Sequence, residues 1–495
     1  MSEPSMASAV GAPVPSVAEN LRRRNFVVIS LLLAATFVVF LNETIMSVAL
    51  VPLMNDLGVD EPTIQWLSTA FMLTMAVVIP MTGFLLQRLT TRQVFLLAMT
   101  LFCLGTLLAL LAPGFPVLLL ARVIQATGTA IMMPLLMTTI MQLVPEESRG
   151  TTMGNISIVI AVAPAIGPTV AGLLLSLGSW RWMFGAVLPI ALLMLLIGAR
   201  YVRNVNEPGR APLDLVSVIL SAIGFSSLVY GLSQLSHLGA ETGIMIIALA
   251  VGVVALTVFV VRQRFLQKVN DALLDLRTFR SANFTATVIM MALAMMALFG
   301  TVILLPIYLQ KALHLEGVTI GLMLLPGGLL MGLSAPLVGR IYDRYGPRWL
   351  LVPGTTLVTV VLWLLTLVSV DTSPYFVMAM HILLSLGLGL TFTPLFTAGM
   401  GSVSPQLYSH ASAIVGTVQQ VAGAAGTSLF VAVMSAQAVS QRDLGASSEV
   451  ATANGVHTAF LLGAILFTLT IGVAFFIHKP AAPEGSPDGA PAGGH

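Results

Sequence analysis

Two charged side chains, Glu43 and Arg122, fall inside long apolar runs of the sequence, where a charge needs a special environment. At a helical rise of 1.5 Å per residue, Glu43 lies roughly 27 Å beyond Asn25, where its apolar run begins. A charge at this depth is unfavourable unless it faces protein or water, or takes up a proton. Glu43 is therefore a candidate proton carrier, and Arg122 is the cation that would tune its proton affinity. A static structural ion pair is the alternative.

The composition indicates that these charges belong to a membrane protein. Of the 495 residues, 57% are hydrophobic and only 8% are charged, whereas a soluble domain carries about 25% charged residues. The net charge of +2 is spread between apolar runs rather than gathered in a patch, so we expect no nucleic-acid partner. The single cysteine, Cys103, excludes a disulfide within the chain.

Fourteen apolar segments are long enough to span a bilayer. Because a chain that crosses lipid must satisfy its backbone internally, they predict an all-α polytopic membrane protein. The segments cover approximately residues 25–50, 63–86, 93–112, 116–142, 151–176, 182–202, 213–235, 242–263, 282–309, 317–341, 348–369, 374–400, 409–437 and 456–477.

The basic residues predict the orientation of these segments. With the N-terminus in the cytoplasm, Arg122 falls inside the membrane and only Arg181, Lys311 and Arg442 of the 22 basic residues fall outside. We therefore expect a multi-pass protein of the cytoplasmic (inner) membrane with both termini cytoplasmic. The ends of the chain, 1–24 and 479–495, are rich in small and polar residues and are predicted to be disordered tails.

An internal repeat divides the chain. Motifs recur 256 residues apart, pairing Gly83, Arg88 and Arg92 with Gly339, Arg344 and Arg348, and Pro134 recurs 260 residues later as Pro394. The repeat predicts two six-helix bundles, 25–203 and 282–478, with two inserted transmembrane helices in 204–265 and a cytoplasmic linker, 266–281. Two such halves form a central cavity at mid-membrane, the usual substrate site of transporters built this way.

The residues around both buried charges resemble a known family. The run Leu41-Asn42-Glu43-Thr44 resembles the first-helix motif of the fourteen-helix drug:proton antiporters of the major facilitator superfamily, and most of all their lincomycin-resistance permease branch. The run from Arg122 to Gly128 resembles the superfamily's fourth-helix motif, R-x-x-Q-G-x-G, with Ala126 in place of one glycine. The resemblance implies the major facilitator fold and a proton-coupling role for Glu43 and Arg122, with Asn42 beside them.

A third motif resembles the fifth-helix antiporter motif of the family. It contains Pro164, Gly167, Pro168 and Gly172. Small residues four apart let two helix backbones approach, and prolines leave carbonyl groups free so that the helix can bend. The motif suits a flexing seal between the halves, and plain tight packing of helices is the alternative.

The sequence from Gly339 to Arg348 is similar to the superfamily's cytoplasmic gate motif, G-x-x-x-D-R-x-G-x-R. Its acid is Asp343, which could accept hydrogen bonds from a helix N-terminus and pair with arginines. In the first copy Gln87 replaces the acid, although Arg88 is retained. We therefore expect the charged lock to depend on Asp343, and the predicted gate residues are Gly339, Asp343, Arg344, Gly346, Arg348 and Arg88.

The substrate cavity is less clearly marked. Residues that would hold an amphiphile, if they face the cavity, are Gln125, Met133, Tyr308 and Phe392. The 26 methionines suit an adaptable pocket, although such stripes also serve as core or lipid-facing filler. His381 and His410 are expected to be ordinary interfacial residues, because the histidines show no metal-ligand spacing and no metal site is predicted.

These features favour a monomeric, proton-coupled antiporter that exports lipophilic neutral or monocationic small molecules. The proton gradient would supply the energy, and no cofactor is expected. A lipid or amphiphile transporter on the same scaffold, with little proton coupling, is the alternative. The sequence contains no phosphate-binding G-x-x-x-x-G-K-[ST] loop and no nucleophile-base constellation, so it favours neither an ATP-driven pump nor an enzyme.

Overall fold

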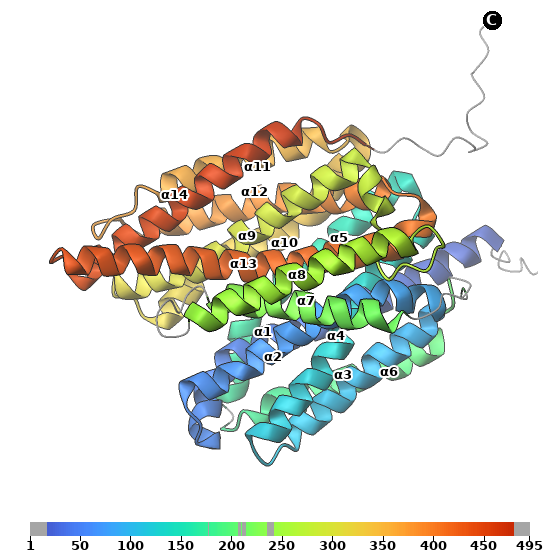
Figure 1. Ribbon diagram of the computed structural model, residues 1–495, viewed down its shortest axis with the longest axis horizontal. Coiled ribbons are helices and arrows are strands. Elements are labelled where there is room, and N and C mark those ends of the chain that lie inside the picture. Colours follow the sequence, from blue (N-terminus) through green and yellow to red (C-terminus); the bar gives the residue numbers. More distant parts are fainter. Residues whose placement is uncertain (1–16, 177, 206–208, 210–213, 235–241, 480–495) are drawn as a thin grey trace, which may run out of the picture.

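The protein is a bundle of long helices that lie side by side (Figure 1). The computed structural model describes residues 17–176, 178–205, 209, 214–234 and 242–479, and within these ranges it has no β-strand. The predicted all-α fold is confirmed.

The helices follow the predicted order. The N-terminal half consists of α1 (Val17–Leu57), α2 (Glu61–Arg88), α3 (Thr91–Leu110), α4 (Phe115–Leu143), α5 (Arg149–Leu175) and α6 (Arg181–Tyr201). The inserted helices are α7 (Leu215–Ser233) and α8 (Thr242–Leu266). The C-terminal half consists of α9 (Ala282–Lys311), α10 (Gly317–Tyr345), α11 (Arg348–Leu365), α12 (Pro374–Gly401), α13 (Tyr408–Asp443) and α14 (Ser448–Ala474). Short 3₁₀ helices, η1 (Glu146–Ser148), η3 (Leu276–Arg280) and η4 (Pro405–Leu407), precede α5, α9 and α13.

Length and hydropathy of the described residues make thirteen of these helices suitable for crossing a membrane. The helix outside this set is α5, in which several side chains lie outside the described part of the structure. The predicted number of fourteen spans therefore stays a prediction, whereas the multi-span character of the protein is established.

Two predicted boundaries are wrong. The predicted N-terminal tail, 1–24, is helical from Val17, and the rest of that tail lies outside the described residues, as does 480–495. The last helix begins at Ser448, eight residues before the predicted start at 456. In both places a helix continues beyond its apolar run, because good helix formers such as Ala18 and Leu21, or a capping residue such as Ser447, sustain it.

The two halves repeat the same packing. In the first half α1 packs on α5 and α6, α2 on α4, and α3 on α4 and α6; the corresponding pairs in the second half are α9 with α13 and α14, α10 with α12, and α11 with α12 and α14. Pro134 and Pro394 lie inside the equivalent helices α4 and α12. The fold is therefore two pseudo-symmetric six-helix bundles plus two inserted helices.

The halves meet along two equivalent seams. In one seam α5 packs on α10, and in the other α13 packs on α2. One end of the bundle holds the start of α1 and the end of α14 (Figure 1). The ends of α2 and α10 and the starts of α5 and α11 lie at the same end, and they carry the arginines Arg88, Arg344, Arg149 and Arg348. We call this end the basic end.

Candidate functional site

The two buried charges both lie in the N-terminal half. Glu43 on α1 is half-buried, and Arg122 on α4 is 2% exposed. Their charges act on each other, but no hydrogen bond or ion pair within 4 Å that involves described residues joins them. The Nδ2 atom of Asn42 and the Nε atom of Arg122 are buried without a hydrogen-bond partner among the described residues. In this conformation Glu43 and Arg122 are therefore not joined as a closed ion pair, and buried donors of Asn42 and Arg122 have no partner among the described residues.

Arg122 is held by three helices. Its Nη1 atom donates a hydrogen bond of 2.6 Å to Oε1 of Gln125, and Nε2 of Gln125 donates one of 2.8 Å to Oγ1 of Thr106 on α3. The guanidinium carbon lies 4.0 Å from the centroid of the Phe71 ring on α2, a cation–π contact. The sequence motif contains Gln125 but not Phe71 or Thr106, because these come from other helices with no motif of their own.

The antiporter motif on α5 packs against the residue that follows Glu43. Oγ1 of Thr44 lies 3.3 Å from the carbonyl oxygen of Ala163 on α5 and 3.0 Å from the Leu41 carbonyl of its own helix, so its one proton can be donated to either. A Cβ added at Gly167 would lie 2.2 Å from Oγ1 of Thr44, so glycine permits this approach. Gly172 is exposed and a Cβ there would meet nothing within 4 Å. The other two motif residues, Pro164 and Pro168, have side chains outside the described part of the structure.

Asp343, near the end of α10, binds the start of α5 at the basic end. Its Oδ1 atom accepts a hydrogen bond of 2.7 Å from the backbone N–H of Gly150. Its Oδ2 atom accepts bonds of 2.8 Å from the Thr151 N–H and 2.7 Å from the Thr151 hydroxyl. A carboxylate suits this position because the N-terminus of a helix carries partial positive charge. Asp343 thus joins the C-terminal half to the N-terminal half.

Two glycines of the gate motif have distinct structural roles. A Cβ at Gly339 would lie 2.2 Å from the carbonyl oxygen of Gly150, so α5 and α10 are in backbone contact there. Gly346 ends α10 with φ of +81°, a conformation that glycine adopts readily, and its N–H donates to the Tyr342 carbonyl.

The motif arginines lie apart from the acid. Among the described residues, no arginine forms an ion pair with the Asp343 carboxylate. Arg344 is exposed, with its guanidinium over the ring of Tyr345, and Arg88 is exposed near the ring of Phe84. Arg348 contacts His478 instead. The expected pairing of the acid with arginines is wrong in this conformation, because the α5 N-terminus already occupies both carboxylate oxygens.

The equivalent position in the other seam belongs to Gln87, at the end of α2. Its Nε2 atom donates a hydrogen bond of 3.2 Å to the Ser409 hydroxyl and lies 2.5 Å from Nε2 of His410, both in the first turn of α13. His410 and His381 are buried, with 5% and 8% exposure. The contact between Gln87 and His410 joins residues that are far apart in the chain and share no motif, so the sequence pattern did not predict it.

The predicted substrate residues are buried or half-buried in this conformation. Gln125 is buried in the Arg122 cluster, the Tyr308 hydroxyl donates a bond of 2.6 Å to the Ser369 carbonyl, Phe392 belongs to the hydrophobic core, and Met133 is half-buried. A cavity of about 530 Å³ lies instead at the basic end, between the α8–α9 connection and the turn before α13. Within the described ranges no group of three His, Cys, Asp or Glu side chains could hold a metal ion.

Known proteins share both the sequence and the fold. Residues 32–427 match the Major Facilitator Superfamily. The chain is 38% identical over 457 residues to the lincomycin resistance protein LmrB of Listeria monocytogenes, covering 91% of this chain and 96% of that protein. It is 29% identical over 456 residues to the puromycin resistance protein pur8 of Streptomyces alboniger, covering 89% of each.

A solved structure is similar in fold. The crystal structure of the human organic anion transporter MFSD10 superimposes with a TM-score of 0.65 at 15% identity, covering 91% of this chain and 99% of that one. A likeness at this identity concerns the fold alone. The family match, which covers most of the chain, and the identity to a relative over nearly its whole length lead to one conclusion: the chain belongs to the major facilitator superfamily and is a transporter, not an enzyme.

Proposed function

We propose that the protein is a proton-coupled antiporter that exports lipophilic neutral or monocationic small molecules by alternating access. The basic end faces the cytoplasm, since the positive-inside rule places its arginines there. The protein resides in the cytoplasmic (inner) membrane, where it binds a drug-like substrate and protons and is surrounded by lipid.

The observation that carries this proposal is the environment of Glu43. Glu43 lies on a membrane helix beside an unpaired Asn42 amide and within the field of Arg122, with no direct ion pair among the described residues to fix its charge. An acid in this setting is suited to exchanging a proton for a substrate. Arg122, held by Gln125 and Phe71, stays in place while Glu43 changes its protonation state.

One helix connects this acid to the gate. Helix α5 contacts Thr44, the neighbour of Glu43, through Ala163 and Gly167, and its first turn binds Asp343. Protonation or substrate binding at Glu43 shifts α1 against α5, and α5 transmits the movement to the gate as a rigid element. This coupling between Glu43 and Asp343 through α5 makes the protein alternate between a state open to the cytoplasm and a state open to the outside.

The proton gradient is sufficient for such transport. One proton that moves down about 130 mV supplies roughly 3 kcal/mol, and this maintains a gradient of a neutral solute of about a hundredfold. Dications should be poor substrates, because two positive charges in a low-dielectric cavity need more acid than Glu43 alone provides. Resistance to lincomycin and puromycin in the relatives' names supports antibiotics as the substrate class.

Transport into proteoliposomes tests the proposal. With an imposed pH gradient of the correct sign, the protein should accumulate a lincosamide antibiotic, and a protonophore should abolish the accumulation. Transport that is indifferent to the pH gradient would contradict proton coupling and favour the lipid or amphiphile transporter.

A further inference from the structure

The seam between α2 and α13 lacks the acid that closes the other seam. Gln87 occupies the place of Asp343 and offers Ser409 and His410 an amide instead of a carboxylate. A neutral hydrogen bond is about half as strong as a charge-assisted one. The closed state of the α2–α13 seam therefore needs another stabilising contact if both seams are to be closed at the same time.

The inserted helices cover this weaker seam. Helix α7 packs on both α2 and α13, so that it bridges the N-terminal and C-terminal halves. Figure 1 shows α7 and α8 lying between α2 and α13. The connection before α7 also reaches the end of α2, because the backbone N–H of Gly209 donates a hydrogen bond of 2.8 Å to the Gln87 carbonyl.

The connection after α8, residues 267–281, is held to the inserted helices by Gln263; we call this connection the strap. Oε1 of Gln263 accepts hydrogen bonds of 2.8 Å and 3.2 Å from the backbone N–H groups of Leu273 and Leu274. Nε2 of Gln263 donates one of 2.6 Å to the Ser217 hydroxyl on α7. Gln263 is fully buried, and both leucines are nearly so. One amide therefore links α7, α8 and the strap.

An ion pair between Asp214 and Arg262 fixes the position of Ser217, the residue of α7 that Gln263 contacts. Asp214, the N-cap of α7, accepts two hydrogen bonds of 2.7 Å from Arg262 and also bonds the Ser217 hydroxyl. The hydrogen bonds from Arg262 lower the pKa of the Asp214 carboxyl to about 2, so it stays ionised under physiological conditions. The partner that Gln263 uses on α7 is therefore fixed.

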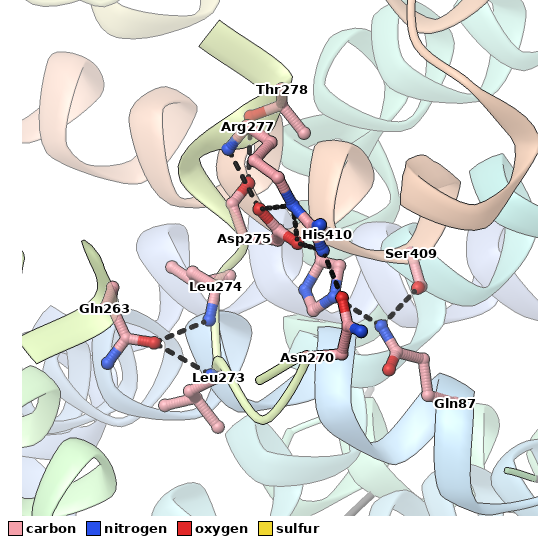
Figure 2. Close-up of polar contacts among 10 residues, drawn as sticks. All are labelled: Gln87, Gln263, Asn270, Leu273, Leu274, Asp275, Arg277, Thr278, Ser409 and His410. Atoms are coloured by element: carbon pink, nitrogen blue, oxygen red, sulfur yellow. Dashed lines mark hydrogen bonds and ion pairs between the residues drawn. The ribbon is translucent and has the colours of Figure 1, made fainter. Parts of the chain in front are cut away.

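On its other side the strap faces the first turn of α13. The His410 ring lies beside Leu273 and within the field of the Asp275–Arg277 ion pair, and the Gln87 amide contacts the same ring (Figure 2). Asp275 is buried and accepts the N–H of Arg277, which keeps the turn rigid. His410 is thus enclosed between the end of α2 and the strap.

We propose that Gln263 is a positioning residue of the transport cycle: it holds the strap against His410 and so keeps the α2–α13 seam closed at the basic end, where the first copy of the gate motif has lost its acid. This inference deepens the alternating access proposed above. In this proposal the inserted helices α7 and α8, together with the strap, stabilise the closed α2–α13 seam in place of the missing acid.

The test measures conformation in the full-length protein. Gln263→Met has similar length but cannot bond Leu273, Leu274 or Ser217. Spin labels on the basic ends of α2 and α13 should show the separated population rising by roughly a hundredfold, as expected for the loss of three neutral hydrogen bonds. Hydrogen exchange at Leu273 and Leu274 should accelerate in the same variant. Neither readout needs a substrate or a proton gradient, so failure of the proposed function would not affect them.

Two further variants separate positioning from general damage. Gln263→Glu retains the acceptor for Leu273 and Leu274 but loses the donor to Ser217, so it should open the seam less than Gln263→Met. Gln234→Met removes an amide that bonds Tyr230 within α7 and should leave the seam closed. If Gln263→Met does not fold, Gln263→Asn, one methylene shorter, makes the same test. Unchanged distances in Gln263→Met or in Gln263→Asn, or opening by Gln234→Met equal to that of Gln263→Met, would overturn the inference.

Discussion

The Oδ1 atom of Asp343 on α10 accepts a hydrogen bond of 2.7 Å from the backbone N–H of Gly150 on α5. This bond joins a side chain of one half to the main chain of the other, and a Cβ at position 150 would lie only 2.4 Å from the same carboxylate oxygen. The closed state at the basic end therefore depends both on the acid and on the glycine opposite it.

Asp343→Asn should open the basic end. The amide NH2 group cannot accept a hydrogen bond, so at least one of the three bonds is lost and the others lose the assistance of the negative charge; charge-assisted hydrogen bonds contribute about 1.5–3 kcal/mol each. We expect the closed-to-open ratio to fall by roughly tenfold to a hundredfold, with slower turnover and little change in expression. Distances between spin labels on the basic ends of α5 and α10 measure this.

Gln87→Ala is the matched comparison for that variant, because it removes only neutral hydrogen bonds, worth about 1 kcal/mol each. It should shift the distances far less than Asp343→Asn. Equal shifts would refute the asymmetry between the two seams.

Gly339→Ala should prevent close contact between α5 and α10. The new Cβ would lie 2.2 Å from the Gly150 carbonyl oxygen, a backbone atom that cannot move without its helix. Overpacking of this kind destabilises by about 1–3 kcal/mol, so transport should fall by about fivefold to a hundredfold. Gly321→Ala, in the same helix with nothing within 4 Å of its Cβ, should transport normally. Normal transport by both variants would contradict the need for backbone contact between α5 and α10 at Gly339.

Thr106→Val should destabilise the fold around Arg122. It leaves Nε2 of Gln125 buried without its 2.8 Å partner, which costs about 1–3 kcal/mol. Thermal unfolding in detergent should show a lower Tm. The control is Thr127→Val, whose hydroxyl bonds only the Val123 carbonyl of its own helix. A Tm equal to that of the control would mean that water replaces the Thr106 hydroxyl.

The sequence predicted the fold well because its signals are local or periodic. Apolar runs defined the helices, and the repeat of Gly83 and Gly339 revealed the two halves. Helix ends were less predictable: polar residues such as Thr452 and Asn454 continue α14 beyond its apolar run.

The candidate site was predicted only in part. Residues within one motif, such as Glu43 and Asp343, were found because the motif itself requires them. Phe71, Thr106 and His410 were missed because their roles depend on how neighbouring helices are rotated against each other, which the pattern of one helix does not encode. The substrate residues stay a prediction: Tyr308, for example, is buried and its hydroxyl donates a hydrogen bond to the Ser369 carbonyl.

The most direct test of proton coupling is proton release from the purified protein. In weakly buffered detergent solution, addition of a lincosamide antibiotic to the wild type should release protons, which a pH indicator dye detects. Glu43→Gln keeps the shape of the side chain but cannot titrate, so it should bind the antibiotic without releasing protons. Proton release from Glu43→Gln equal to that of the wild type would contradict the assignment of Glu43 as the proton carrier.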